Sequence, residues 1–198
     1  MNDRVVTLRQ KLPEIAVEAA MVVFAVFAAF GVEEWREERQ LRQFAQVART
    51  AVETEIAENL EEFLGAEPVL TALVAQLDEL LQTARAGGVE LHDELNLALR
   101  MPRTSTAAWR AAQGSQAAPY FDHDWVIRVS RIYELYEGYA DVRRQVVADY
   151  GRVVARRASF RGMSPAGLVE SFEPLSGSLW MLRQLHGEMA GGLARLVE

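Results

Sequence analysis

The feature that most constrains the fold is an apolar run near the N-terminus that leads without a break into charged sequence. Residues 12–39 read LPEIAVEAAMVVFAVFAAFGVEEWREER, and no polar side chain occurs from Ala19 to Val32. Counted from Ile15 to Trp35, an α-helix would be about 31 Å long, close to the hydrocarbon thickness of a bilayer. Trp35 stands where such a helix would leave the hydrocarbon, a favourable position for an amphipathic ring. The run predicts a membrane anchor.

The anchor is predicted over residues 13–35, after a short tail, and it contains one ionisable side chain, Glu18. A carboxylate near the membrane boundary can reach the headgroups, and a helix N-terminus favours negative charge. Glu18 is therefore either an interface residue or a functional group for proton handling or helix contact. The run has two alternative interpretations. It is short enough for a buried core helix, and Arg4, Arg9 and Lys11 before it also suit a cleaved signal peptide.

Composition limits the classes of function. The chain has 198 residues, half of them hydrophobic, a net charge of −7 and no cysteine. The acidic balance argues against a nucleic-acid partner, which requires a basic face. The lack of cysteine excludes disulfides, thiolate catalysis and cysteine-bound zinc. The length suits one domain over residues 36–198 beyond the anchor and the tail of residues 1–12.

The rest of the chain shows helical periodicity and no strand alternation, so we expect an all-α fold in which the N-terminal transmembrane helix continues into an antiparallel helical bundle. Glycine and proline predict where the helices end. The predicted elements are a first helix from Pro13 to Leu64, a boundary at Gly65 and Pro68, a second helix over 69–85, an amphipathic piece over 90–101, a short helix around Trp109 capped by Thr104, Ser105 or Thr106, and a loop over 114–120.

A third long helix, capped by Asp122 or Asp124, has a heptad-like apolar face that is typical of helical bundles. The face comprises Val129, Ile132, Tyr136, Tyr139, Val146, Tyr150 and Val153. Arg143 and Arg157 share it, and a buried arginine needs a carboxylate or a bound anion. We therefore take four residues as a candidate interaction or ligand face: Tyr136, Tyr139, Arg143 and Tyr150. After a break around Arg161 and a second at Pro174 and Gly177, a last helix is predicted from Ser178.

Motifs for catalysis or metal binding are not found. His123 between two aspartates and His92 beside Asp93 and Glu94 lack the spacing of a metal site, so we expect no metal and no cofactor. Nucleotide-binding, hydrolase and zinc-protease signatures are missing as well, so we do not expect an enzyme. The acidic run from Glu53 to Glu62 is interpreted as a solvated helix face.

Two stretches resemble an uncharacterised family of bacterial single-pass membrane proteins, known only as a domain of unknown function. The first is VEAAMVVFAVFAAFGVEEWREERQ, with Glu18 opening the span and Trp35 before the charged run Glu37, Glu38 and Arg39. The second is TSTAAWRAAQGSQAAPYFDHDWVIRVSRIYELYE, with Trp109 and Tyr133 in the matching places. In its loop this chain reads QGSQAAPY where the family has S-G-x-L. The resemblance implies a membrane anchor with a mostly helical domain, and no activity.

We therefore expect a single-pass protein of the bacterial inner membrane with a structural, scaffolding or protein-interaction role. Its partners would be the lipid bilayer and another protein or a second copy. Because the tail before the span is short and basic, we expect residues 36–198 to lie in the periplasm. One alternative is a small-ligand-binding sensory domain, and another is a membrane-associated enzyme. A sensor should have a pocket lined by Tyr136, Tyr139 or Arg143, whereas a scaffold should have a packed interior and an exposed apolar patch.

Overall fold

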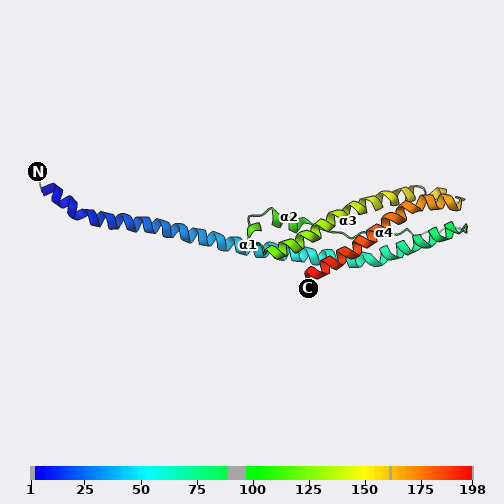
Figure 1. The fold of residues 1–198 in the computed structure, drawn as a ribbon, viewed down its shortest axis with the longest axis horizontal. Coiled ribbons are helices and arrows are strands. Elements are labelled where there is room, and N and C mark those ends of the chain that lie inside the picture. Colours follow the sequence, from blue (N-terminus) through cyan, green and yellow to red (C-terminus); the bar gives the residue numbers. More distant parts are fainter. Residues whose placement is uncertain (1–2, 89–96, 161, 198) are drawn as a thin grey trace.

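The computed structural model describes the backbone of residues 3–88, 97–160 and 162–197, and side chains at Val17 and from Ala20 onward within these ranges, except Arg157. Within these ranges the chain contains helices and no strand, so the predicted all-α class is confirmed (Figure 1). The elements are α1 (Asp3–Arg85), α2 (Ala107–Gln113), the 3-10 turn η1 (Ala118–Tyr120), α3 (His123–Ala155), the 3-10 turn η2 (Arg157–Ser159) and α4 (Pro165–Val197).

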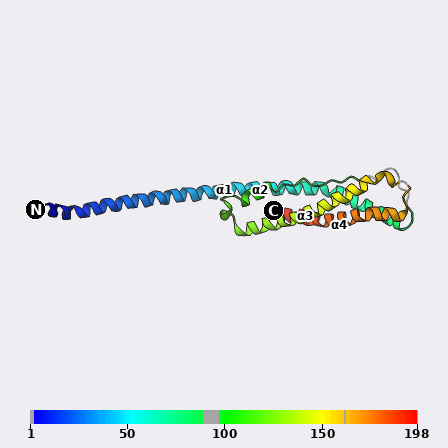
Figure 2. The ribbon, with the colours of Figure 1, turned by 90° about the horizontal axis from the view of Figure 1, so that it is seen from above.

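Helix α1 is one continuous helix of 83 residues, which corresponds to about 125 Å at the rise of an α-helix. It begins at Asp3, earlier than the predicted Pro13. Its N-terminal part projects from the other helices as a rod, and its first described buried side chain is Ala45 (Figures 1 and 2). The packed core of the bundle therefore begins near Ala45 on α1. Among the described residues, no helix combines the length and the apolar character needed to cross a membrane.

The bundle consists of α3, α4 and the C-terminal half of α1. Helices α1 and α3 run away from the rod, and α4 returns between them, packing against both (Figures 1 and 2). One core cluster joins the three helices through residues such as Phe63 and Leu77 of α1, Tyr139 of α3 and Leu182 of α4. The return from α1 to α3 is made by residues 97–106, which form no helix, and by α2.

Two predicted helix boundaries are wrong, because α1 passes through Gly65 and Pro68 without ending. Proline removes one backbone donor, so only one hydrogen bond of the ladder is lost. Pro68 is exposed, while the core face continues through Ala66 and Leu70. Gly65 is exposed as well, and a Cβ there would meet only the flexible end of the Arg100 side chain, at 3.3 Å from Nη2. The free energy gained by burying Ala66 and Leu70 outweighs the cost of placing Gly65 and Pro68 inside the helix.

The break predicted before Ser178 is also wrong, because α4 begins at Pro165 and continues through Pro174. Pro174 lies on the exposed side of the helix, and Phe172 and Leu175 beside it are fully buried. The buried face of α4 therefore continues past Pro174, which removes only one backbone hydrogen bond on the exposed side of the helix. Of the amphipathic piece predicted over 90–101, residues 90–96 lie outside the described part, and residues 97–101 are not helical.

The predicted third helix is confirmed as α3. Its Asp122 cap accepts a hydrogen bond from the amide of Trp125 at 2.8 Å. The predicted core positions are buried, namely Val129, Ile132, Tyr136, Tyr139, Val146 and Val153, and the structure adds Trp125, Tyr133 and Asp149. Tyr150 is half-buried, and its hydroxyl donates to the carbonyl oxygen of Leu97 at 2.9 Å. That bond fixes the non-helical segment to α3.

We predict that alanine changes the free energy of unfolding differently at two glycines of α4. Gly187 is exposed with nothing near its missing Cβ, so Gly187→Ala should raise the free energy of unfolding by about 0.5–1 kcal/mol. At Gly192 a Cβ would overlap Cδ1 of Ile132, so Gly192→Ala should lose this gain. Ile132→Val deletes that methyl group and should partly rescue Gly192→Ala while costing about 0.5–1.5 kcal/mol alone. Chemical denaturation of the four variants measures this, and equal gains at both glycines would contradict it.

Candidate functional site

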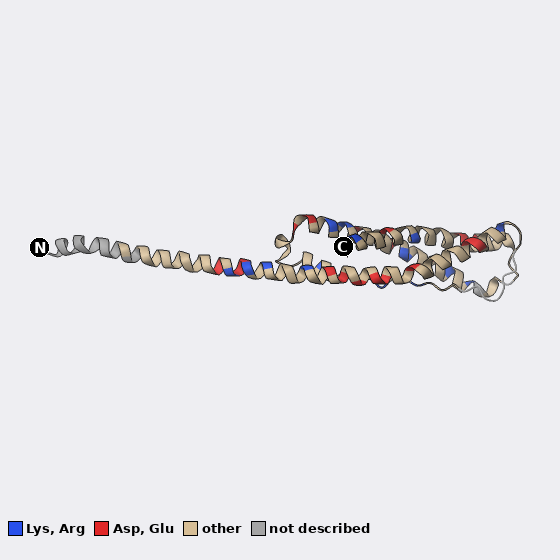
Figure 3. Cartoon of the chain, turned by 90° about the horizontal axis from the view of Figure 1, so that it is seen from below, with Lys and Arg blue, Asp and Glu red and all other residues tan. Residues whose placement is uncertain are grey.

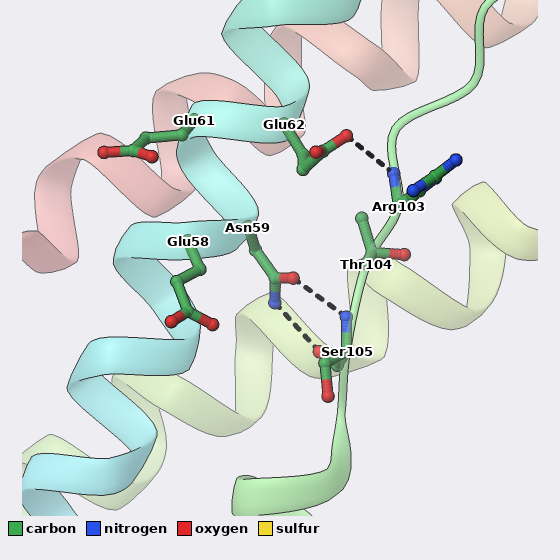
Figure 4. A pocket seen from close by; sticks show the side chains of 7 residues that line it. All are labelled: Glu58, Asn59, Glu61, Glu62, Arg103, Thr104 and Ser105. Atoms are coloured by element: carbon green, nitrogen blue, oxygen red, sulfur yellow. Dashed lines mark hydrogen bonds between the residues drawn. The ribbon is translucent and has the colours of Figure 1, made fainter.

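A row of polar side chains on α1 binds the backbone of the non-helical segment (Figure 4). The Asn59 amide pairs with Ser105 in both directions, donating to its carbonyl at 2.8 Å and accepting from its N–H at 2.9 Å. One turn further on, the Arg103 N–H donates to Glu62 Oε2 at 3.0 Å. Asn59 is only 2% exposed. The predicted solvated face is therefore wrong at Asn59 and at Glu55, because both meet a segment that no helical pattern reveals.

Glu55 is the most connected residue of this row. Glu55 is 6% exposed, and its carboxylate accepts hydrogen bonds from the Ser105 hydroxyl and the Tyr133 hydroxyl, both at 2.6 Å. It also accepts from the backbone amides of Ala108 at 2.9 Å and Trp109 at 3.3 Å. Glu55 thus caps α2 from another helix. Of the cap residues predicted over 104–106, Ser105 contributes, since its hydroxyl accepts a hydrogen bond from the Ala107 amide at 3.2 Å, whereas Thr106 at the N-cap position forms no side-chain cap bond.

The hydrogen bonds around Glu55 determine the ionisation of its carboxyl and of the Tyr133 phenol. Burial alone would raise the pKa of the Glu55 carboxyl, but the bonds from Ser105, Tyr133 and the two α2 amides lower it below the ordinary 4.5. Burial, and then the bond to Glu55, raise the pKa of the Tyr133 phenol. Glu55 is therefore a stable anion at neutral pH, and Tyr133 is a stable donor to it.

Aromatic rings continue from this carboxylate into the core. Trp109 of α2 stacks on Tyr133 with ring centres 5.5 Å apart, and it meets Trp125 edge-on at 6.0 Å. Tyr133 in turn stacks on Tyr136 at 6.1 Å, and Tyr136 meets Phe63 of α1 edge-on. These large rings fill the space between α1 and α3. Among the described residues they form a packed interior.

Three buried polar atoms near Phe63 have no hydrogen-bond partner among the described residues: Tyr136 Oη, Tyr139 Oη and His186 Nδ1. Nε2 of His186 lies 2.8 Å from the carbonyl oxygen of Phe63 and 3.2 Å from Oε2 of Glu67. Burial raises the pKa of the Tyr136 phenol to about 12, against the opposing effects of Thr104 and of the Arg143 charge. Burial also raises the pKa of Tyr139, again opposed by Arg143.

Arg143 is half-buried and forms no ion pair with a described residue. Of the two roles predicted for it, pairing with a carboxylate of residues 53–62 is not observed in the described part of the chain. Tyr136, Tyr139 and Arg143 follow one another on α3 at steps of three and four residues and so lie on one side of that helix. Tyr150 contributes a structural bond to Leu97 instead. For Arg157, no side chain is described.

Two open clefts border the polar row on α1. One of about 600 Å³ lies between Glu58, Glu61 and Glu62 of α1 and residues 103–105 (Figure 4). The other, of about 500 Å³, lies between α1 from Arg42 to Glu53 and residues 120–122. Neither is lined by the predicted tyrosine and arginine face. Within the described residues, no three acidic or histidine side chains are grouped as metal ligands; His123 is exposed, and His92 lies outside that part.

The rod of α1 carries the largest run of exposed apolar side chains. Phe24, Phe27 and Phe30 are 69–75% exposed, and Val32 and Trp35 are each 58% exposed. Figure 3 shows this uncharged stretch ending at a band of acidic and basic residues before the bundle. The guanidinium carbon of Arg39 lies 5.5 Å from the Trp35 ring centre, a cation–π contact. The side chains of Glu18 and Ala19, also predicted in the anchor, are outside the described part.

Comparison with known proteins yields no relative: the chain matches no family model, no curated protein and no solved structure. The resemblance to single-pass bacterial proteins around Trp35 and Trp109 therefore stays a prediction.

We predict that Glu55→Gln lowers the free energy of unfolding at pH 7 by about 1–3 kcal/mol, because the amide weakens bonds that the anion accepts. The folded-state pKa is lowered, so this stabilisation is present above pH 4.5 and is lost as the pH falls through the folded pKa. The difference in the free energy of unfolding between the wild type and Glu55→Gln should therefore shrink as the pH falls. Denaturant melts at several pH values test this, with exposed Glu58→Gln as the matched control; a constant difference would contradict it.

Proposed function

We propose that the protein is a single-pass membrane protein whose helical bundle has a structural or protein-interaction role at the membrane. The observation that supports it most is the exposure of the phenylalanines and valines of the α1 rod, which no described element covers. Contiguous exposed apolar side chains of this kind are typical of surfaces that contact a membrane or another protein. Apolar residues occur on all sides of the rod from Ala20 to Val32, which favours lipid over a single partner helix.

The proposed anchor runs over residues 13–35 and so includes residues 13–16, Glu18 and Ala19, whose side chains the structure does not describe. Trp35 and Arg39 at its end suit the headgroup layer, where amphipathic rings and long basic side chains are enriched. We propose the bacterial inner membrane as its location, with the bundle in the periplasm. This location rests on the resemblance and on the basic residues Arg4, Arg9 and Lys11 before the anchor.

A scaffolding or interaction role is favoured over ligand sensing by the packed interior. Tyr139 is 1% exposed and lies against Phe63 with ring centres 5.0 Å apart. The two clefts lie elsewhere. In addition, α1 joins the anchor to the bundle core without a break. The partner would be another protein or a second copy.

The sensory alternative is supported by one observation. Among the described residues, the buried phenol oxygen of Tyr139 has no hydrogen-bond partner, and the charge of the half-buried Arg143 acts on it and on Tyr136. Such donors suit a small anion. An anion sensor would show a rise in melting temperature on adding its ligand, and this rise would disappear in Arg143→Met.

We predict that the full chain stays in the membrane pellet after alkaline extraction. The double change Phe24→Asp with Phe27→Asp should release it, because an acidic residue at the centre of a span costs about 2.5–3.5 kcal/mol. Phe44→Asp is the matched control, since Phe44 is 58% exposed on the same helix beyond the apolar run. Quantitative blotting of the fractions measures release. Wild-type protein in the soluble fraction would refute the anchor.

We further predict that alkaline phosphatase fused to the C-terminus is active, because this enzyme folds only outside the cytoplasm. The reason is that a short tail with Arg4, Arg9 and Lys11 crosses the membrane poorly. A green fluorescent protein fused at the same point should be dark. Bright fluorescence with an inactive phosphatase would place the bundle in the cytoplasm.

A further inference from the structure

The outer face that α1 and α4 form together bears two large apolar side chains that no described element covers. Leu64 of α1 is 58% exposed, and Trp180 of α4 is 56% exposed. The two helices lie side by side along the bundle and run in opposite directions (Figures 1 and 2). Contiguous uncovered apolar side chains on a packed bundle are typical of a surface that contacts a partner.

Contacts between the helices show that both side chains lie along the adjoining sides of α1 and α4. Asp78 of α1 accepts a hydrogen bond from α4 at 3.4 Å, and Glu173 of α4 accepts one from α1 at 2.9 Å. A step of seven residues makes two turns and returns to the same side of a helix within about 20°. Leu64 precedes Asp78 by two such steps, and Trp180 follows Glu173 by one.

The large Leu64 on α1 is level with a missing side chain on α4. Nε2 of His186 lies 2.8 Å from the carbonyl oxygen of Phe63, so these two residues are level in the bundle. Leu64 and Gly187 follow them in antiparallel helices and therefore differ in height by only about 3 Å. Gly187 is exposed, and no atom lies within 4 Å of the position of its missing Cβ. A recess on α4 thus lies beside a protruding leucine on α1.

The reverse arrangement occurs about 16 Å further from the rod. The Ser176 hydroxyl donates to Asp78, which makes these two residues level. Trp180 lies four residues from Ser176 and Ala75 lies three residues from Asp78, both towards the rod, so they are level within about 2 Å. Here the large side chain is on α4 and the small one is on α1. Large and small residues therefore alternate between the two helices.

The seam between the helices carries one charge of each sign at one height. Glu67 lies one turn beyond Phe63, with Oε2 at 3.2 Å from Nε2 of His186, and its side chain is 44% exposed. Arg183 is exposed and lies three residues before His186, which places it level with Glu67. It follows Ser176 by seven residues, so it also projects on the side of α4 that adjoins α1. Both charges are accessible to a partner.

A second copy of the chain is the partner that this face fits. Most homodimers have a two-fold axis. Copies anchored in one membrane point the same way, so the axis must run along the bundle. This symmetry sets α1 of one copy beside α4 of the other and keeps every residue at its own height. It joins three complementary pairs between the copies: Leu64 with Gly187, Trp180 with Ala75, and Glu67 with Arg183.

We propose that the chain forms a parallel homodimer in which the α1–α4 faces of two copies build one four-helix bundle. The inference rests on the proposed membrane anchor and names the second copy as the partner. From residue 57 to residue 75 the face is about 27 Å long and two helices wide, or about 500 Å² on each copy. The total of about 1,000 Å² is at the lower limit for a specific interface. Because anchoring raises the effective concentration, the dimer should be populated in the membrane and weak in free solution.

Cysteine cross-linking tests the arrangement, because the chain has no cysteine of its own. Full-length chains with Leu64→Cys and with Gly187→Cys carry different tags, are co-expressed, and are oxidised in isolated membranes. We expect a disulfide-linked dimer that contains both tags, since a disulfide requires Cα atoms within about 7 Å. Either variant expressed alone should give no cross-link, because the axis separates the two copies of each position. Glu137→Cys, at an exposed position of α3, replaces Gly187→Cys in the control pair and should give none.

A charge placed on the face tests whether the interface holds the copies together. Trp180→Glu in both chains should lower the cross-linked fraction by about tenfold, because it buries an unpaired charge between the copies. Phe44→Glu is the matched control, since Phe44 is an aromatic residue of similar exposure, 58%, outside the face, and it should leave cross-linking unchanged.

Two kinds of failure are distinguishable. No mixed-tag dimer, or equal cross-linking in the mixed and control pairs, would overturn the dimer while the protein remains in the membrane pellet. Equal losses in Trp180→Glu and Phe44→Glu would overturn it as well. Absence of the wild-type chain from the membrane pellet would instead overturn the anchor, and the parallel arrangement with it.

Discussion

The structure depends on acceptors for backbone amides that have no partner within a helix or strand, at the end of the non-helical segment and in the first turn of α2. Residues 103–109 cross the space between α1 and α3, where buried amides would cost free energy if they lacked acceptors. Glu55, Asn59 and Glu62 provide those acceptors from successive turns of α1. Because Glu55 also accepts from Tyr133, the same carboxylate joins α1, α2 and α3. The segment and its aromatic residues then take the place that a fourth long helix would fill in an ordinary bundle.

The continuity of the long helices follows from how burial is distributed. Pro68 and Pro174 each remove a backbone donor, yet both lie on exposed sides of α1 and α4. The core faces beside them hold fully buried side chains such as Leu70 and Leu175. A helix interrupted at either proline would expose that apolar area, which costs more than one lost hydrogen bond. Tertiary packing therefore overrides the local preference.

The buried face of α3 and the contacts of Glu55 differ in how far the sequence alone could reveal them. The α3 face could be predicted, because the repeat from Val129 to Val153 is a local pattern that bundles bury. The role of Glu55 could not, since it depends on contacts with Ser105 and Tyr133 that are distant in the sequence. The spacing of Glu55, Asn59 and Glu62 on one helical side, with an amide among acids, is the only local signal of the polar row. That Arg143 forms no ion pair with a described residue likewise depends on which side chains the fold brings near it.

The uninterrupted passage of α1 from the rod into the core has a mechanical consequence. From Trp35 to Arg85 the helix spans about 75 Å at its normal rise, and no described turn or break interrupts it. For a membrane-anchored α1, a tilt of about 20°, which is ordinary for a membrane helix, would move the far end sideways by about 25 Å. Bilayer thickness would then act on the bundle through leverage, and the orientation of the surface offered to a partner would depend on the lipid around the anchor.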